Sequence, residues 1–198
     1  MRISRRGARA FGMLWTIATA AGRATRWAIG AAAGEVEGGV VSAFCGGSLS
    51  GALQWQALRR RLSSASWWAA ASVLGWAGGA LVGLAVESAT AGAVERTLGA
   101  SIALALVTTM QWMYLRRRAP RSGWWFIANV AALGVGSGAV LAISALIGAP
   151  MVGAPGGAIL GLGIGATTGT ALVWLLNGAR CPTDGSGSSL RMLTTGGN

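Results

Sequence analysis

The feature that most limits the folds open to this chain is a long stretch without a charged residue, from Ser122 to Ala179. It is long enough for two membrane spans of roughly 20 residues each. Pro150 and Pro155 mark the turn between them. The composition agrees, because 53% of the residues are hydrophobic and only 11% are charged. The sequence therefore predicts an all-α integral membrane protein.

Further apolar windows earlier in the chain approach the length that crosses a bilayer. The predicted transmembrane domain covers residues 11–179, with six helices at about 11–34, 38–58, 66–87, 96–115, 123–147 and 152–177. Residues 1–10 are predicted to form a basic arm, and residues 180–198, rich in Gly, Ser and Thr, a disordered tail. The first helix has an alternative interpretation, because a basic segment followed by a short apolar run also resembles a signal peptide.

An internal repeat organises these helices. The segment QWQALRRRLSSASWW, from Gln54 to Trp68, returns as QWMYLRRRAPRSGWW, from Gln111 to Trp125, with eight identities in fifteen positions. We expect three tandem copies of two helices each, at residues 11–61, Trp67–Arg118 and Trp124–Arg180. An even number of spans gives every copy the same orientation, so a symmetry axis would run along the membrane normal. This pattern is compatible with a pseudo-threefold arrangement.

Charge predicts the orientation. All 16 basic residues are arginines, and thirteen of them lie in the N-terminal arm, the two repeat loops and the tail. Cytoplasmic segments retain basic residues, so both termini are predicted to be cytoplasmic, in a bacterial inner membrane. The arginine triplets of the repeat loops are predicted to contact anionic lipids of the inner leaflet. These residues are Arg59, Arg60, Arg61, Arg116, Arg117 and Arg118.

Tryptophans accompany the arginines. Eight of the ten lie near the predicted cytoplasmic ends of the helices: Trp15, Trp55, Trp67, Trp68, Trp112, Trp124, Trp125 and Trp174. The indole ring is large and amphipathic, and it is favourable at the depth of the lipid headgroups. The sequence therefore predicts a belt of tryptophan anchors at the inner interface.

Glycines spaced by four residues mark the packed faces of two predicted helices. The rows are Gly75, Gly79 and Gly83 in the third helix and Gly153, Gly157, Gly161, Gly165 and Gly169 in the sixth. Helices in lipid associate largely through close backbone contact, which small residues permit. The rows predict glycine-zipper packing within the chain, with oligomerisation as the alternative.

Two arginines interrupt the first predicted span. Arg26 shares a fourfold-spaced row with Gly22 and Gly30, so it should project from the packed face, with Arg23 close to the same face. A charged side chain at mid-bilayer costs at least about 2.5–3.5 kcal/mol, so both arginines need partners or water. The predicted polar site comprises Arg23, Arg26, Glu35, Glu87 and Asn129. Alternatively, both arginines snorkel to an interface.

The chain has little material for catalysis. It has no His and no Lys, one Tyr and five acidic residues. Acid–base pairs, nucleophile triads and metal sites need such groups, so we expect no enzyme, no catalytic or metal-binding residue and no cofactor. The net charge of +11 fits the inner leaflet of a membrane, and we expect no nucleic acid partner.

The paired QWxxLRRR…WW elements resemble small multipass bacterial membrane proteins of uncharacterised function with the same Trp and Arg arrangement between spans. The likeness covers about residues 11–180 and implies membrane anchoring without any activity. Two function classes remain. The scarcity of ionisable groups favours a structural or accessory protein that packs with other membrane subunits or with itself. The alternative is a small transporter or channel with a polar path near Arg23 and Arg26, and the oligomeric state is open.

Overall fold

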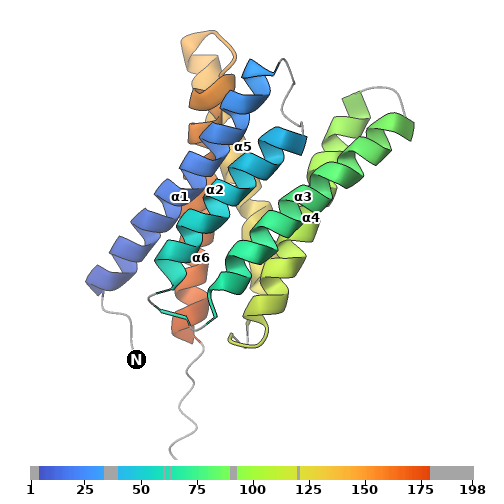
Figure 1. Cartoon of the computed structure of the whole chain (residues 1–198). Helices are drawn as coiled ribbons and strands as arrows, with labels where there is room; N and C mark the ends of the chain where they lie inside the picture. Colours follow the sequence, from blue (N-terminus) through green and yellow to red (C-terminus); the bar gives the residue numbers. More distant parts are fainter. Residues whose placement is uncertain are drawn as a thin grey trace, which may run out of the picture.

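The computed structural model describes residues 5–33, 40–59, 61–62, 64–89, 93–119 and 121–178. All regular structure in these residues is helical, which confirms the predicted all-α class. The elements are α1 (Arg5–Ala32), α2 (Val40–Leu58), α3 (Ser66–Ala89), α4 (Ala93–Leu115), α5 (Trp124–Ile147) and α6 (Gly153–Gly178). The helices stand beside one another and alternate in direction (Figure 1).

Three of the described helices have the length and the apolar composition of membrane spans. Within the described residues, Ser66–Ala85, Trp124–Ile147 and Gly153–Asn177 are long and apolar enough to cross a membrane. Ser101–Leu115, in α4, is a shorter apolar helix. Helix α1 begins at Arg5, inside the segment predicted to be a separate arm. Residues 5–10 of the predicted arm are therefore helical and continue into the first predicted span, and arginine is a good helix former.

The helices form a ring in chain order. Each helix contacts the one before it, and α6 returns to pack along α1 in the most extensive contact of the bundle. The contact between α4 and α5 is by far the smallest, so the ring has one thin seam. Because each described helix packs on its ring neighbours, the side chains that point inward meet at the centre of the bundle.

Glycine allows neighbouring helices to approach closely. A Cβ atom added to Gly75 in α3 would lie 2.6 Å from Val107 Cγ2 in α4, and one added to Gly161 in α6 would lie 2.6 Å from Ala20 Cα in α1. Real contacts of Cβ atoms rarely fall below 3.4 Å, so a larger residue would force the helices apart. Gly79, Gly157, Gly165 and Gly169 also face neighbouring helices. Gly153 begins α6 with a φ of 64° and lies in more open surroundings.

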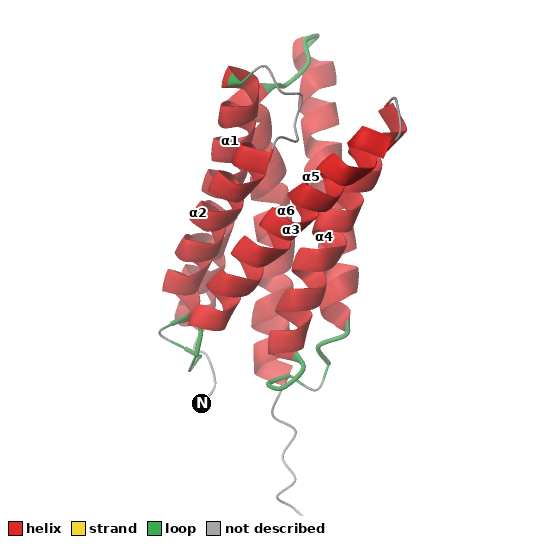
Figure 2. Cartoon of the chain, turned by 45° about the vertical axis from the view of Figure 1, so that its right-hand side comes forward, coloured by secondary structure: helices red, strands yellow, loops and turns green. Residues whose placement is uncertain are grey.

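The two ends of the bundle differ. The start of α1, the connections α2–α3 and α4–α5, and the end of α6 lie at one end (Figure 2). We call it the arginine end, because the described arginines Arg59, Arg61, Arg116, Arg117, Arg118 and Arg121 belong to these connections. The larger apolar core lies near this end and includes Phe11, Leu58, Leu115 and Leu172. This core forms one wall of the candidate site.

Candidate functional site

Three tryptophans meet inside the bundle. Trp15, Trp68 and Trp125 come from α1, α3 and α5, and each side chain is at most 1% exposed. The ring centroids are 5.3 Å apart for Trp15–Trp68, 5.5 Å for Trp68–Trp125 and 6.5 Å for Trp15–Trp125, all edge to face. Each such pair contributes about 0.5–1.5 kcal/mol beyond the burial of its surface. This tryptophan triad fills the bundle interior near the arginine end.

The prediction that these three residues anchor the headgroup region is wrong, because they touch other helices and are hidden from lipid. Their sequence neighbours Trp67 and Trp124 are 68% and 54% exposed. Successive residues of a helix point about 100° apart, so only one tryptophan of each pair can face the interior. The outer tryptophan of each pair remains available for the membrane interface.

Each indole N–H of the triad donates a hydrogen bond to a polar side chain on a neighbouring helix. Trp68 Nε1 lies 3.0 Å from Gln54 Oε1, and Trp125 Nε1 lies 3.3 Å from Gln111 Oε1. Trp15 Nε1 lies 3.0 Å from the hydroxyl oxygen of Thr168. Gln54, Gln111 and Thr168 are spaced by 57 residues each, because 111 − 54 = 57 and 168 − 111 = 57.

A second set of bonds links the glutamines to small polar residues. Gln54 Nε2 donates to Thr19 Oγ1 over 3.0 Å, and Gln111 Nε2 donates to Ser72 Oγ over 3.1 Å. Both hydroxyls stand four residues after a tryptophan of the triad and donate to its backbone carbonyl. The glutamine amides therefore use both their oxygen and their nitrogen inside the protein.

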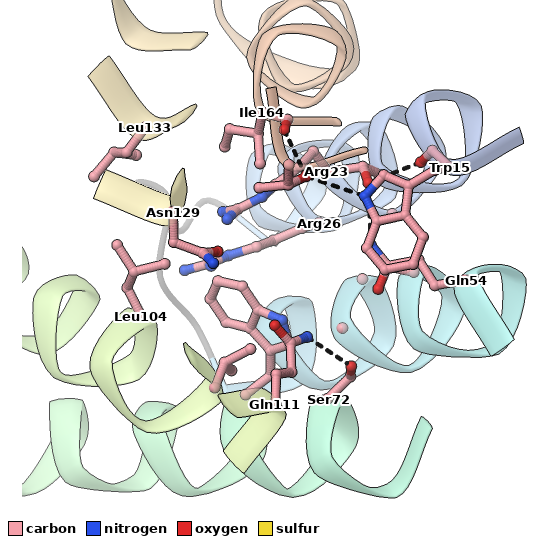
Figure 3. Close-up of a pocket in the computed structure, with 18 of the residues that line it drawn as sticks. Trp15, Arg23, Arg26, Gln54, Ser72, Leu104, Gln111, Asn129, Leu133 and Ile164 are labelled. Atoms are coloured by element: carbon pink, nitrogen blue, oxygen red, sulfur yellow. Dashed lines mark hydrogen bonds between the residues drawn. The ribbon is translucent and has the colours of Figure 1, made fainter. Parts of the chain in front are cut away.

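A cavity of ≈ 60 Å³ lies beside the triad at the centre of the ring (Figure 3). About four water molecules would fill this volume. All six helices line it, and its polar residues are Thr19, Arg23, Arg26, Ser50, Gln54, Ser72, Gln111, Asn129 and Thr168. Among the described lining residues there is no acidic side chain. The cavity is therefore polar and positively charged.

Both arginines of the first helix reach into this cavity (Figure 3). The Cζ atom of Arg23 lies 4.6 Å from the ring centroid of Trp76, and that of Arg26 lies 5.0 Å from it. A guanidinium group over an indole face gains roughly 0.5–2 kcal/mol. Gly46 provides the room for Arg26, because a Cβ atom at position 46 would lie 2.6 Å from Arg26 Cβ.

The predicted polar site is brought together in part. Arg23, Arg26 and Asn129 line one cavity, and Asn129 Nδ2 donates to the backbone carbonyl of Trp125 over 2.8 Å. The side chains of Glu35 and Glu87 lie outside the described residues. The part of the chain that the structure describes also holds no group of three or more His, Cys, Asp or Glu residues that could bind a metal.

The arginine triplets mostly contact their own chain. Arg59 and Arg116 lie over Trp55 and Trp112, four residues earlier in each case, with distances of 5.1 and 5.4 Å from Cζ to the ring centroid. Arg61 donates to the carbonyl of Gly7 and lies over Phe11. Arg118 donates to the carbonyl of Tyr114 over 3.3 Å. Arg117 is exposed, and Arg60 lies outside the described residues.

Sequence reasoning missed the polar residues around the triad. Gln54 and Gln111 are part of the repeat. Thr168 follows Gln111 by the same interval that separates the two glutamines, and this constant interval is the signal that could have identified the three as buried hydrogen-bond acceptors. A comparison of the chain with protein-family models, curated proteins and solved structures finds no match in any of the three. The resemblance based on the Trp and Arg elements therefore stays a prediction, and the function has to be inferred from the chemistry of the site.

Proposed function

We propose that this protein is a small membrane transporter or channel whose polar path passes through the central cavity. One observation carries the proposal, namely that all six helices line a single cavity into which two arginines project. Ionisable residues are costly in a bilayer, and those that face an internal cavity usually mark the path of a solute or ion.

The proposed protein has six spans. Helices α3, α5 and α6 contain the stretches long enough to cross a membrane, and the other three pack lengthwise against them or against each other. A helix packed along a membrane span shares its environment, which supports placing α1, α2 and α4 in the bilayer too. The burial of Phe11 and Trp15 in the core supports retention of the first helix over its removal as a signal peptide.

Three structural copies are also part of the proposal. Trp68 and Trp125 donate to Gln54 and Gln111 in the same way, although the pairs are 57 residues apart. In the first copy, Trp15 donates to Thr168, which occupies the position of the glutamines. These corresponding bonds support a pseudo-threefold bundle in which the third copy has exchanged glutamine for threonine.

A structural or accessory role was the expectation from sequence, because the spans contain few ionisable groups, and the glycine rows offered a face for packing with other subunits. These glycines face helices of the same chain, as Gly75 faces Val107 and Gly161 faces Ala20. A packed face that is already covered is not available for another subunit. The glycine rows therefore support internal packing and do not supply a face for another subunit.

We propose that the arginine end faces the cytoplasm of a bacterial cell, because basic residues are retained on that side of the inner membrane. Single cysteines placed near Glu37, Ala91 or Gly153 should react with an impermeant reagent in intact cells. Cysteines beside Arg60 or Arg117 should react only after the membrane is opened. Labelling of the arginine end in intact cells would refute both the orientation and the six-span arrangement.

Transport itself is tested with purified protein in liposomes. Release of salts and small neutral solutes should be faster from vesicles that contain the protein than from empty vesicles. Ser50→Leu places a larger apolar side chain in the cavity and should abolish the difference, whereas Ser66→Leu, at an exposed position of α3, should not. Equal release from the wild type and Ser50→Leu, in variants with matching melting temperatures, would contradict the proposed path.

A further inference from the structure

We propose that the central cavity is a binding site for a small monovalent inorganic anion, such as chloride or nitrate, and that the guanidinium group of Arg23 holds it. The inference rests on the proposed function in one respect, because it requires that solutes reach the cavity. It adds the charge and the size of the ligand. Three properties of the cavity favour such an anion: its free hydrogen-bond donors, its charge and its volume.

Arg23 has donors to offer. Within the described residues, the one hydrogen bond, ion pair or ring contact of its guanidinium group is the cation–π contact with Trp76, with 4.6 Å between Cζ and the ring centroid. A cation–π contact does not use up the five N–H donors of a guanidinium, which lie in the plane of the group. Figure 3 shows this side chain extending into the cavity. An anion is the natural acceptor for such in-plane donors.

Most other polar groups of the cavity are already committed. Gln54 and Gln111 each bond through oxygen and nitrogen, as described above. The hydroxyl of Thr168 donates to the carbonyl of Ile164 over 2.7 Å. Ser50 is different, because its hydroxyl lines the cavity with no hydrogen-bond partner in the described residues. A Cβ atom on Gly22, the residue before Arg23, would touch Ser50 Cβ, so α1 and α2 are in close contact at this level, and both Arg23 and Ser50 line the cavity.

Charge favours an anion over a cation or a neutral solute. The described lining residues include two arginines and no carboxylate. The positive charge of an arginine that is removed from water requires a counter-charge or strong hydrogen-bond acceptors. An anion beside Arg23 supplies both. The inference does not depend on Arg26, which makes further interactions of its own. Arg26 also lies beside the indole of Trp76, and its positive charge adds to the selection against cations.

Volume limits the size of the ligand. A cavity of ≈ 60 Å³ has room for an ion with one or two water molecules, since each water needs about 10–15 Å³ measured in this way. A large organic anion such as gluconate does not fit without rearrangement of the helices. Chloride and gluconate salts of potassium therefore form a pair of probes that share the cation and the charge of the anion and differ strongly in the size of the anion.

The test is a titration of the purified full-length protein in mild detergent, in which potassium chloride replaces potassium gluconate at constant ionic strength. Binding to the folded state raises the melting temperature by mass action, so the melting temperature should rise and saturate with chloride. Nitrate should act like chloride. In Arg23→Gln the midpoint should move to at least about tenfold higher chloride, because a charge-assisted hydrogen bond is lost.

Two variants serve as controls. Arg59→Gln removes an arginine that is also stacked on a tryptophan but lies at the arginine end, so its midpoint should match the wild type. Arg23→Lys keeps the charge and should retain saturable binding within a few-fold of the wild type. These comparisons separate a specific anion site from a general effect of surface charge.

The wild-type titration alone can overturn the inference, even where Arg23→Gln does not fold. A melting temperature that does not respond to chloride, or responds without saturation, contradicts the site, as does an unchanged midpoint in Arg23→Gln. Saturable binding without flux in liposomes would support the anion site and contradict the proposed transport. Flux of cations or neutral solutes without chloride binding would contradict the anion site and support transport.

Discussion

Replacing Gly75 with alanine measures how much the close contact between α3 and α4 contributes to stability. The added Cβ atom would lie 2.6 Å from Val107 Cγ2 and 2.7 Å from Val107 Cα. Ordinary contact begins at 3.4 Å, so the two backbones must separate by about 3.4 − 2.7 = 0.7 Å at this point. Overpacking of this kind costs about 1–3 kcal/mol. Gly78, three residues further along the same helix, has no atom within 4 Å of an added Cβ and is the matched control.

Both alanines gain the same helix propensity of roughly 0.5–1 kcal/mol, so the difference between the two variants isolates the contact. We expect Gly75→Ala to melt about 2–12 °C below Gly78→Ala, since 1 kcal/mol corresponds to roughly 2–4 °C for a chain of this size. Tryptophan fluorescence of the purified proteins in detergent follows the transition. Melting temperatures within 1 °C of each other would show that α3 and α4 are not held at this separation.

Two further predictions concern the interior network. Gln111→Leu should destabilise the fold by about 1–3 kcal/mol, because it leaves the buried indole N–H of Trp125 without an acceptor, whereas exposed Gln56→Leu should have little effect. Trp68→Ala should cost about 3–5 kcal/mol and Trp67→Ala much less, as the two side chains are 0% and 68% exposed. Thermal melts measure both pairs, and similar losses within either pair would contradict the network.

The parts of the fold that follow from local pattern could be predicted from the sequence. Helix class depends on apolar length and composition, and the glycine rows depend on a spacing of four, both of which are visible in one chain. The positions of Gly75, Gly157 and Gly161 against neighbouring helices agree with that spacing. Arg23 and Asn129 both belong to the predicted polar site, and the two do line one cavity.

The orientation of the tryptophans could not be predicted from composition and spacing alone. Trp67 and Trp68 are chemically identical and adjacent, and only the rotation of α3 in the ring decides which one enters the core. The polar partner of the inner tryptophan, Gln54, lies on another helix, so it does not appear in the local pattern of α3. Two features of the sequence carried this information. The hydrogen-bond acceptors Gln54, Gln111 and Thr168 recur every 57 residues, and a polar residue follows each inner tryptophan by four positions.

Closure of the ring between α1 and α6 sets the order of events during synthesis. The bond between Trp15 and Thr168 joins residues that are 153 positions apart, and it belongs to the most extensive helix contact of the bundle. At about 5–20 residues per second, the ribosome needs roughly 8–30 s to make the chain between them. During that time α1 has no partner for the face that will meet α6. The ring of helices therefore cannot close until α6 has been synthesised. The packing of α6 on α1 is the last step of folding.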